Sequence, residues 1–286
     1  MKWIPVTLGA LALVGCMSAA AFSLGGIAWS RASERMRREM RDGAIRPPPV
    51  APGDVSLPEP VARYLARSIP PGADPIGTAR LQQEGEFRTG EGPEGWRTFT
   101  ADQVVRTYPP AFLWDARISM APLVTVRVRD GYGDGQGAMA AKVGGLIPVM
   151  DALPTPELAR AALERYLAEA AWTPSRLLPG HGLTWEGADD SSAVATLTDR
   201  GLSVSVTVSF SADGDVVRVF VPDRGREVDG AYVPTPWLGR FWDHGPAPDG
   251  YRIPRQGEVA WVLDGDTVPY WRGRLTSVGY GRRPDA

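Results

Sequence analysis

The first 30 residues constrain this chain more than any other part of it. Between Lys2 and Arg31 no side chain is charged, and most are apolar. At about 1.5 Å per residue, such a stretch is long enough for a helix to cross a hydrocarbon core roughly 30 Å thick. Trp3 and Trp29 bracket the stretch, as aromatic residues do at the two membrane interfaces. We therefore expect a single-pass transmembrane anchor over residues 1–30.

The residues after the anchor predict its orientation. Arg31, Arg35, Arg37, Arg38 and Arg41 follow the apolar stretch, whereas a single lysine precedes it. The positive-inside rule therefore places the body of the protein in the cytoplasm. We interpret residues 31–56 as a solvated basic juxtamembrane helix followed by a stiff, proline-rich spacer of polyproline type.

A second interpretation of the N-terminus leads to the opposite side of the membrane. Leu13-Val14-Gly15-Cys16 resembles a bacterial lipobox, in which the cysteine becomes lipid-modified and the body is extracytoplasmic. The residues after Cys16 stay apolar, and arginines would hinder export, so we favour the retained anchor. Cys16 is the only cysteine, and no disulfide can form within the chain.

Residues 57–286 are predicted to form a single α+β domain. Apolar and polar residues alternate over 112–120, 124–128 and 202–210, which is typical of antiparallel strands covered on one face. Asp213-Gly214 and Asp264-Gly265 are tight hairpin signals. Helical spacing predicts a short helix near 59–68 and a long one near 156–171. We expect about ten strands in a large curved sheet, with both helices packed on its concave face.

The sequence contains no catalytic, nucleotide or metal motif, and we expect neither cofactor nor metal. A net charge of −2 argues against a nucleic-acid partner, which needs a basic surface. Ten tryptophans are many for this length, and some could line a cavity for a flat or apolar ligand. The predicted ligand-binding residues are Trp114, Arg165, Glu169, Trp172, Trp185, Trp237 and Trp271.

Several of these segments are similar to an uncharacterised bacterial family of unknown function. The similar segments are Leu57–Leu65, Pro109–Ala116, Glu164–Pro174, Trp185-Glu186 and Tyr270-Trp271-Arg272. The resemblance covers nearly all of residues 57–280 and implies an N-terminal membrane helix, a proline-containing spacer and one folded body. It implies no activity.

More remotely, the layout resembles the half-barrels of lipoprotein carriers, in which an antiparallel sheet curls around helices and holds acyl chains. Gly250–Pro254 and the strand-rich C-terminal end carry this resemblance, whereas the arginine-flanked anchor departs from it. Three functions stay open. The first is a membrane-anchored module that binds a lipid or other apolar ligand. The second is a non-catalytic tethered scaffold with an unidentified protein partner, and the third is a hydrolase that uses Glu164, Glu169 or Glu186.

Overall fold

The computed structural model describes residues 4–45, 57–90 and 95–281, with side chains from residue 20 onward. The described residues form one antiparallel sheet of thirteen strands, in the order β6-β5-β4-β3-β2-β1-β13-β12-β11-β10-β9-β8-β7. The strands are β1 (Thr78–Arg88), β2 (Trp96–Arg106), β3 (Ala111–Ala121), β4 (Val124–Gly133), β5 (Gln136–Val143), β6 (Ile147–Ala152), β7 (Leu183–Asp189), β8 (Ser192–Asp199), β9 (Leu202–Phe210), β10 (Val216–Val228), β11 (Ala231–Pro246), β12 (Arg252–Leu263) and β13 (Asp266–Gly281).

The predicted antiparallel sheet with packed helices is confirmed, with thirteen strands where about ten were expected. The three alternating segments form β3, β4 and β9, and both predicted hairpins occur, between β9 and β10 and between β12 and β13. The extra strands escaped prediction because their alternation is broken. In β13, for example, Pro269 and three glycines interrupt it, and its pairing with β12 shifts register between Val259 and Ala260.

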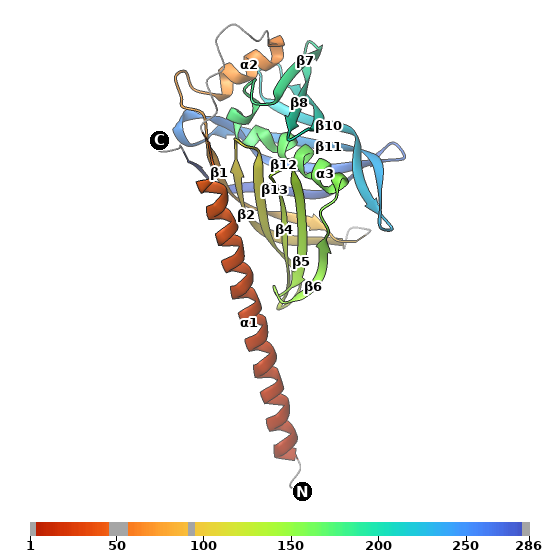
Figure 1. Cartoon of the computed structure of the whole chain (residues 1–286). Coiled ribbons are helices and arrows are strands. Elements are labelled where there is room, and N and C mark those ends of the chain that lie inside the picture. The colour runs from red at the N-terminus through yellow and green to blue at the C-terminus, as the bar shows by residue number, and fades with distance from the viewer. Residues whose placement is uncertain (1–3, 46–56, 91–94, 282–286) are drawn as a thin grey trace.

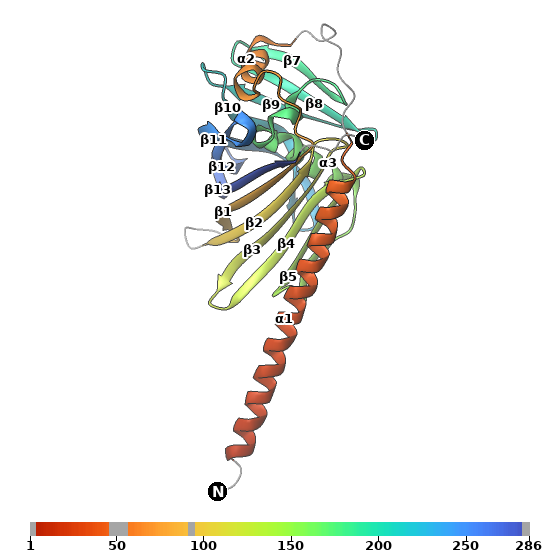
Figure 2. The same ribbon diagram turned by 90° about the vertical axis from the view of Figure 1, so that its left-hand side faces the viewer.

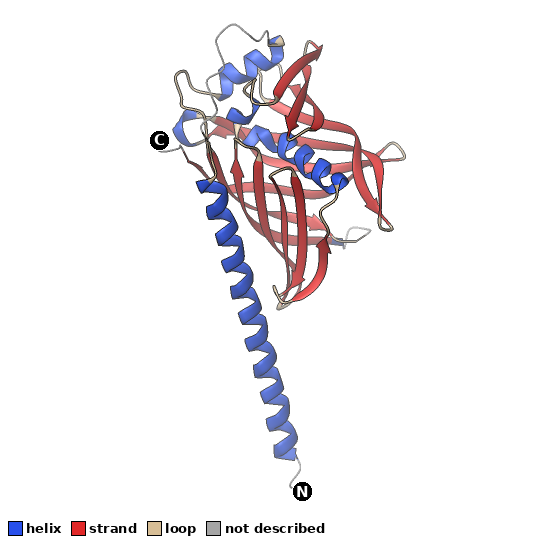
Figure 3. Cartoon of the chain, viewed as in Figure 1, coloured by secondary structure: helices blue, strands red, loops and turns tan. Residues whose placement is uncertain are grey.

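The order of the strands forces the chain to cross the sheet once. Strands β1 to β6 run outward to one edge, and β7 to β13 run from the opposite edge back to β1. The connection between the two edges contains α3 (Pro156–Ala168) and the 3₁₀ helices η2 (Glu169–Trp172) and η3 (Pro174–Leu177). It lies across the concave face, and the sheet curls around it (Figures 1 and 3). We call this connection the strap.

Local sequence explains where the strap begins and ends its regular helix. Thr155 caps α3 by accepting a hydrogen bond from the Leu158 backbone N–H at 3.2 Å, and Pro156 occupies the first turn. The predicted helix 156–171 ends as an α-helix at Ala168, and its last turn tightens into η2. Leu163, Tyr166 and Leu167 face the core as predicted.

The short predicted helix is confirmed as α2 (Glu59–Ser68). Val61, Tyr64 and Leu65 are buried, and the Tyr64 ring lies 5.6 Å from that of Phe210 on β9. Helix α2 therefore covers the end of the half-barrel near β7 to β9, where Figure 2 shows it above the strands. A short 3₁₀ helix, η4 (Pro248–Gly250), connects β11 to β12.

A third helix packs on the outer face of the sheet, which the sequence did not predict. Helix α1 (Ile4–Asp42) runs through the boundary predicted at residue 30, and its C-terminal half lies along the sheet (Figure 2). Trp29 is 4% exposed and donates from Nε1 to Asp115 Oδ1 at 2.9 Å. Arg37 pairs with the other oxygen of Asp115 at 3.0 Å. Trp29 is thus buried against protein, and Arg37 of the predicted solvated helix forms a buried ion pair.

At the other end of this contact, the backbone of α1 lies close to the turn between β5 and β6. A Cβ on Gly25 would lie 2.7 Å from the Cβ of Leu146, and one on Gly145 would lie 3.0 Å from the Gly25 carbonyl oxygen. Gly25, Trp29, Ser33 and Arg37 recur every four residues, so they share one side of the helix. Because these four residues are a glycine, an aromatic residue, a serine and an arginine, apolar periodicity does not identify this side of the helix as a packing surface.

The transmembrane prediction is not supported by the described residues, among which no helix combines the length and the apolarity needed to cross a membrane. The side chains of residues 1–19, including Cys16, and the spacer at 46–56 lie outside the described residues. The division at residue 57 stays a prediction.

Replacing Gly25 by Leu tests the docking of α1. Leucine favours a helix by about 1 kcal/mol over glycine, so a weaker helix cannot explain the result. We expect Gly25→Leu to displace α1 and to accelerate tryptic cleavage after Arg31 and Arg35 in the detergent-purified full chain. Ala28→Leu adds the same side chain to an exposed position of the helix and should cleave at the wild-type rate. Equal rates for the two variants would contradict the docking.

Candidate functional site

The concave face gathers most of the residues predicted to bind a ligand. Trp114, Trp172, Trp237 and Trp271 are buried there in one hydrophobic core. Trp185 on β7 is half-buried and packs against the same core beside Phe210, and its Nε1 donates to the Leu177 carbonyl at 3.1 Å. Because the tryptophans pack against protein, their contact with a ligand stays a prediction.

The predicted polar pair Arg165 and Glu169 joins the strap to the sheet. Arg165 donates to Glu169 at 2.7 Å and also pairs with Asp130 on β4. Glu169 accepts from Gln103 on β2 at 2.7 Å. Burial acts to lower the pKa of Arg165, but the two carboxylates outweigh it and raise that pKa above its usual value. These contacts orient the strap, and we assign them a structural role.

The hydrogen-bond network continues from Gln103 to Trp114. Gln83 on β1 donates to Gln103 at 2.9 Å and accepts from the Trp114 indole at 2.8 Å. A second strap carboxylate, Glu164, is 1% exposed and accepts from Arg160 at 2.9 Å and Arg224 at 3.2 Å. The pair of Arg160 with Glu164, four residues apart on one helix, is the spacing that the sequence showed. The contacts of Glu164 with Arg224 and of Gln83 with Gln103 and Trp114 were not predictable, because their partners lie on distant strands.

The carboxylates proposed for hydrolysis do not form a joint site. Glu164 and Glu169 each pair with different arginines, and Glu186 is exposed on β7. A pair of carboxylates must flank one substrate bond to act as acid and base. This arrangement lends no support to the hydrolase.

Two tryptophans on the concave face contain unpaired polar atoms. The rings of Trp172 and Trp271 lie 6.1 Å apart, and neither buried indole N–H has a hydrogen-bond acceptor among the described residues. Gly257 and Gly273, paired on β12 and β13, make room for these rings. A Cβ on Gly273 would lie 2.9 Å from the Trp271 ring. An unpaired buried donor costs about 1–3 kcal/mol, so this part of the core is polar but unsatisfied.

A buried arginine further along the strap lacks a counter-ion among the described residues. Arg176 on η3 is 7% exposed and stacks 3.7 Å from the centre of the Tyr166 ring. Its Nε and Nη2 have no hydrogen-bond partner, and it forms no ion pair among the described residues. Burial lowers the pKa of Arg176, although Tyr166 and Glu169 act to raise it. No pattern in the sequence singles out Arg176, which follows the predicted helix 156–171.

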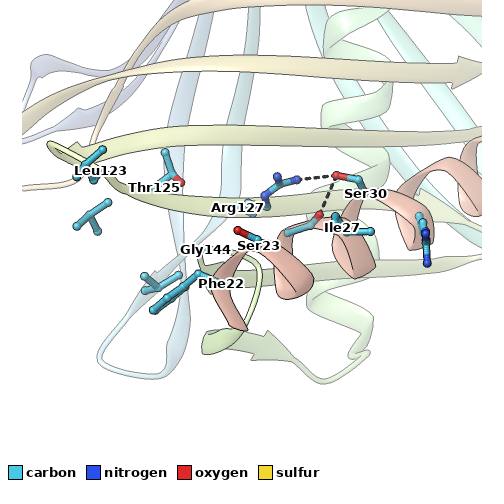
Figure 4. Close-up of a pocket in the computed structure, with 12 residues that line it drawn as sticks. Phe22, Ser23, Ile27, Ser30, Leu123, Thr125, Arg127 and Gly144 are labelled. Carbon is cyan, nitrogen blue, oxygen red and sulfur yellow. Dashed lines mark hydrogen bonds between the residues drawn. The ribbon is translucent and has the colours of Figure 1, made fainter. Parts of the chain in front are cut away.

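A groove opens on the outer face, between α1 and the ends of β4 and β5 (Figure 4). Its volume is about 560 Å³, within the range of small-molecule sites. The lining residues are Phe22, Ser23, Gly26, Ile27, Ser30, Arg31, Leu123, Val124, Thr125, Arg127, Val143 and Gly144. We call it the outer groove.

The outer groove is cationic at one end. Arg127 donates from Nη1 to Ser30 Oγ at 2.9 Å, and Arg31 lies nearby on α1. Neither arginine forms an ion pair with a carboxylate of the described residues. The alternation along β4 predicts Arg127 and Arg129 on its polar face. It does not predict that α1 covers this face, because the sequence of α1 up to residue 30 is typical of a membrane anchor.

Exposed apolar side chains surround the other end of the outer groove. Leu123 lies in the β3–β4 turn and Val124 begins β4, and beside them Leu146 lies in the β5–β6 turn and Ile147 begins β6. Val149 and Met150 extend the surface along the edge strand β6. Phe22, Leu24 and Ile27 of α1 are exposed at the same end. We call Leu123, Val124, Leu146, Ile147, Val149 and Met150 the apolar rim. Helix α1 continues beyond the rim toward the N-terminus (Figure 1).

Taken together, these features define a half-barrel strapped by a helix, with an amphipathic groove on its outer face. The chain belongs to a family of unknown function, DUF6920, whose model matches residues 55–280. The predicted resemblance to an uncharacterised family is thereby confirmed. A comparison with curated proteins gave no match.

Among solved structures, the chain is similar to a crystal structure from Vibrio parahaemolyticus of a domain described as an outer membrane lipoprotein-sorting protein domain. The two share 9% identity, with 73% of this chain and 87% of that chain covered and a TM-score of 0.35. The predicted resemblance to lipoprotein carriers thus has a distant counterpart, but a TM-score this low supports no conclusion about function.

Proposed function

We propose that this protein binds lipid at a membrane surface, with the apolar rim inserted into the bilayer. The observation that supports this most directly is the rim itself, which lies beside α1 at one end of the sheet. Leu123 is fully exposed, and Ile147 and Val149 are more than half exposed. Contiguous exposed apolar side chains on turns are typical of interaction and membrane-contact sites.

The sequence upstream of the rim supports a bilayer as the partner. Helix α1 passes the rim, and from Ile4 to Ala21 its sequence has no charged residue. Burying one exposed Leu, Val or Ile side chain contributes about 1.5–3 kcal/mol. The rim would therefore add several kcal/mol to whatever attachment α1 provides. A scaffold would use the same surface for a protein partner, and the uncharged sequence of α1 beside the rim favours a bilayer instead.

Cysteine labelling tests the insertion of the rim. In a Cys16→Ser background, a fluorophore on Leu123→Cys or Ile147→Cys should be quenched by nitroxide on lipid acyl chains, once the full chain is reconstituted in vesicles. Leu153→Cys provides the matched control, since Leu153 is also exposed but lies at the opposite end of β6. Insertion is ruled out if the labels at 123 and 153 are quenched equally.

We propose that the body faces the cytoplasm. Arg31, Arg35, Arg38 and Arg41 remain outside the buried contact of α1, and each would cost roughly 2.3 kcal/mol to move against 100 mV. Fusions of alkaline phosphatase and of a fluorescent protein to Ala286 report the side. We expect fluorescence without phosphatase activity. The reverse result would place the body outside and support lipidation of Cys16.

The concave face is a second location for a lipid, favoured by the unpaired Arg176. An acidic headgroup would supply its missing counter-ion, and Trp172 and Trp271 of the same core would contact the acyl chain and donate their free N–H groups. This keeps the predicted set Trp114, Arg165, Glu169, Trp172, Trp185, Trp237 and Trp271 as the surroundings of a ligand.

Arg176→Met tests this interior site. We expect solvent extraction of the purified wild-type protein to release an acidic lipid that the variant has lost, because methionine keeps the packing and removes the charge. Arg255→Met, at an exposed position of β12, should retain the lipid. If wild type contains no ligand and Arg176→Met raises Tm, the arginine is an uncompensated buried charge and the interior site is rejected.

A further inference from the structure

We propose that the outer groove binds the phosphate headgroup of an anionic phospholipid drawn from the adjacent bilayer. This inference rests on the proposed membrane contact and adds to it the class of lipid and the residues that select it. The groove lies between α1 and β4, with Arg127 and Ser30 toward one end and Leu123 of the apolar rim at the other (Figure 4).

The cationic end has the donors that a phosphate needs. Arg127 donates one N–H to Ser30 and has no other described acceptor for its remaining N–H groups. Arg31 lines the same end without a described partner. Guanidinium groups bind phosphate oxygens through paired, charge-assisted hydrogen bonds. Two such groups suit a headgroup phosphate with a charge of about −1.

The packing of α1 leaves Arg127 partly desolvated. A Cβ on Gly26 would lie 3.3 Å from Arg127 Nη2, so the absence of a side chain at Gly26 lets the guanidinium lie against the helix. Burial lowers the pKa of Arg127, neighbouring Arg117 lowers it further, and Asp115 opposes both. Asp115 is itself paired with Arg37. A bound anion would supply the compensation that the protein does not.

On the opposite side of α1 the balance of charges differs, so the preference for an anion is confined to the outer groove. There a second cleft is lined by Glu84, Asp102 and Asp115 together with Arg37 and Arg117. Three carboxylates disfavour an anion in that cleft. Helix α1 therefore separates an acidic cleft from the outer groove, whose charged lining residues are both arginines.

The shape of the outer groove favours a lipid over a free phosphate or an acidic peptide. Along α1, the lining changes from Phe22 and Ile27 to Ser30 and Arg31. On the sheet side, it changes from Leu123 and Val124 to Thr125 and Arg127. Both walls therefore become apolar toward the rim. An amphipathic molecule with its phosphate beside Arg127 would direct its acyl chains toward the rim, where the bilayer lies in the proposed function.

Native mass spectrometry of the full chain tests the site. The protein is released from detergent micelles that contain equal phosphatidylglycerol and phosphatidylcholine. We expect wild type to retain one phosphatidylglycerol in preference to phosphatidylcholine. Arg127→Gln should reduce that preference about tenfold or more, because a charge-assisted contact is lost. Arg31→Gln should act in the same direction, and it removes no described contact of the fold.

The matched control is Arg38→Gln. It removes the same charge from an exposed position of α1, about 10 Å further along the helix, and should retain wild-type preference. Inorganic phosphate at millimolar concentration should not displace the lipid. Displacement would identify a free-phosphate site instead, and equal retention of both lipids by wild type would overturn the inference.

Two further measurements distinguish loss of the lipid site from loss of α1 docking and from loss of membrane contact. Tryptic cleavage after Arg35 reports whether α1 stays docked, and Arg127→Gln should leave it at the wild-type rate. Quenching of the label at Leu123→Cys should also persist in Arg127→Gln, because the rim is intact. Loss of lipid preference with quenching retained supports the groove. Absence of quenching in every variant would reject the membrane contact while leaving the measured lipid preference to stand on its own.

Discussion

The strap over the concave face is the contact on which the rest of the structure depends. An open sheet of thirteen strands has two edges and one large apolar face, and this face must be covered to be stable in water. The strap covers it because the chain can pass from β6 to β7 only across the sheet. Its charges are not incidental: Arg165 reaches Asp130 on β4, and Glu164 reaches Arg224 on β10. Ion pairs of the strap therefore connect both halves of the sheet.

Those ion pairs contribute more to geometry than to stability. Replacing a buried ion pair by apolar residues is often neutral or stabilising, whereas removing one partner costs about 3–5 kcal/mol. Glu164 and Arg165 point in different directions from one helix, so both pairs form only when α3 lies at one angle and one depth. The tryptophans then pack into the space that remains, over Gly257 and Gly273.

The sequence predicted those parts of the fold in which one residue type repeats. Alternation along β3 and β9, the stripe of α3 and the boundaries of α2 are local patterns, and they are all confirmed. The outer position of α1 was not predictable in the same way. Trp29 and the arginines around it fit a membrane flank, and only Asp115, on a strand distant in sequence, makes the buried contact visible.

The candidate sites show the same division between local and distant information. Spacing alone identified Arg165 and Glu169 as an ion pair, because a pair four residues apart can be found in one helix, but the sequence favoured a surface pair and did not show that Asp130 and Gln103 would enclose it. Arg176 and Arg127 gave no such signal. Each is recognised by the absence of a carboxylate, which a sequence cannot show. The two arginines also have neighbours of different chemistry, since Arg176 stacks on the Tyr166 ring and Arg127 lies against Ser30 and Gly26.

The two proposed lipid locations differ in how a ligand reaches them. The outer groove is open along α1, and a lipid can enter it without breaking a contact of the sheet. The interior is covered by the strap, so a lipid enters it only if the strap moves, and a movement of α3 separates Glu164 from Arg224 or Arg165 from Asp130. Such an opening separates paired charges and uncovers the apolar face of the sheet, so it is rare and exchange through it is slow. The groove is therefore suited to lipid in rapid exchange with the bilayer, and the interior to a ligand that stays bound.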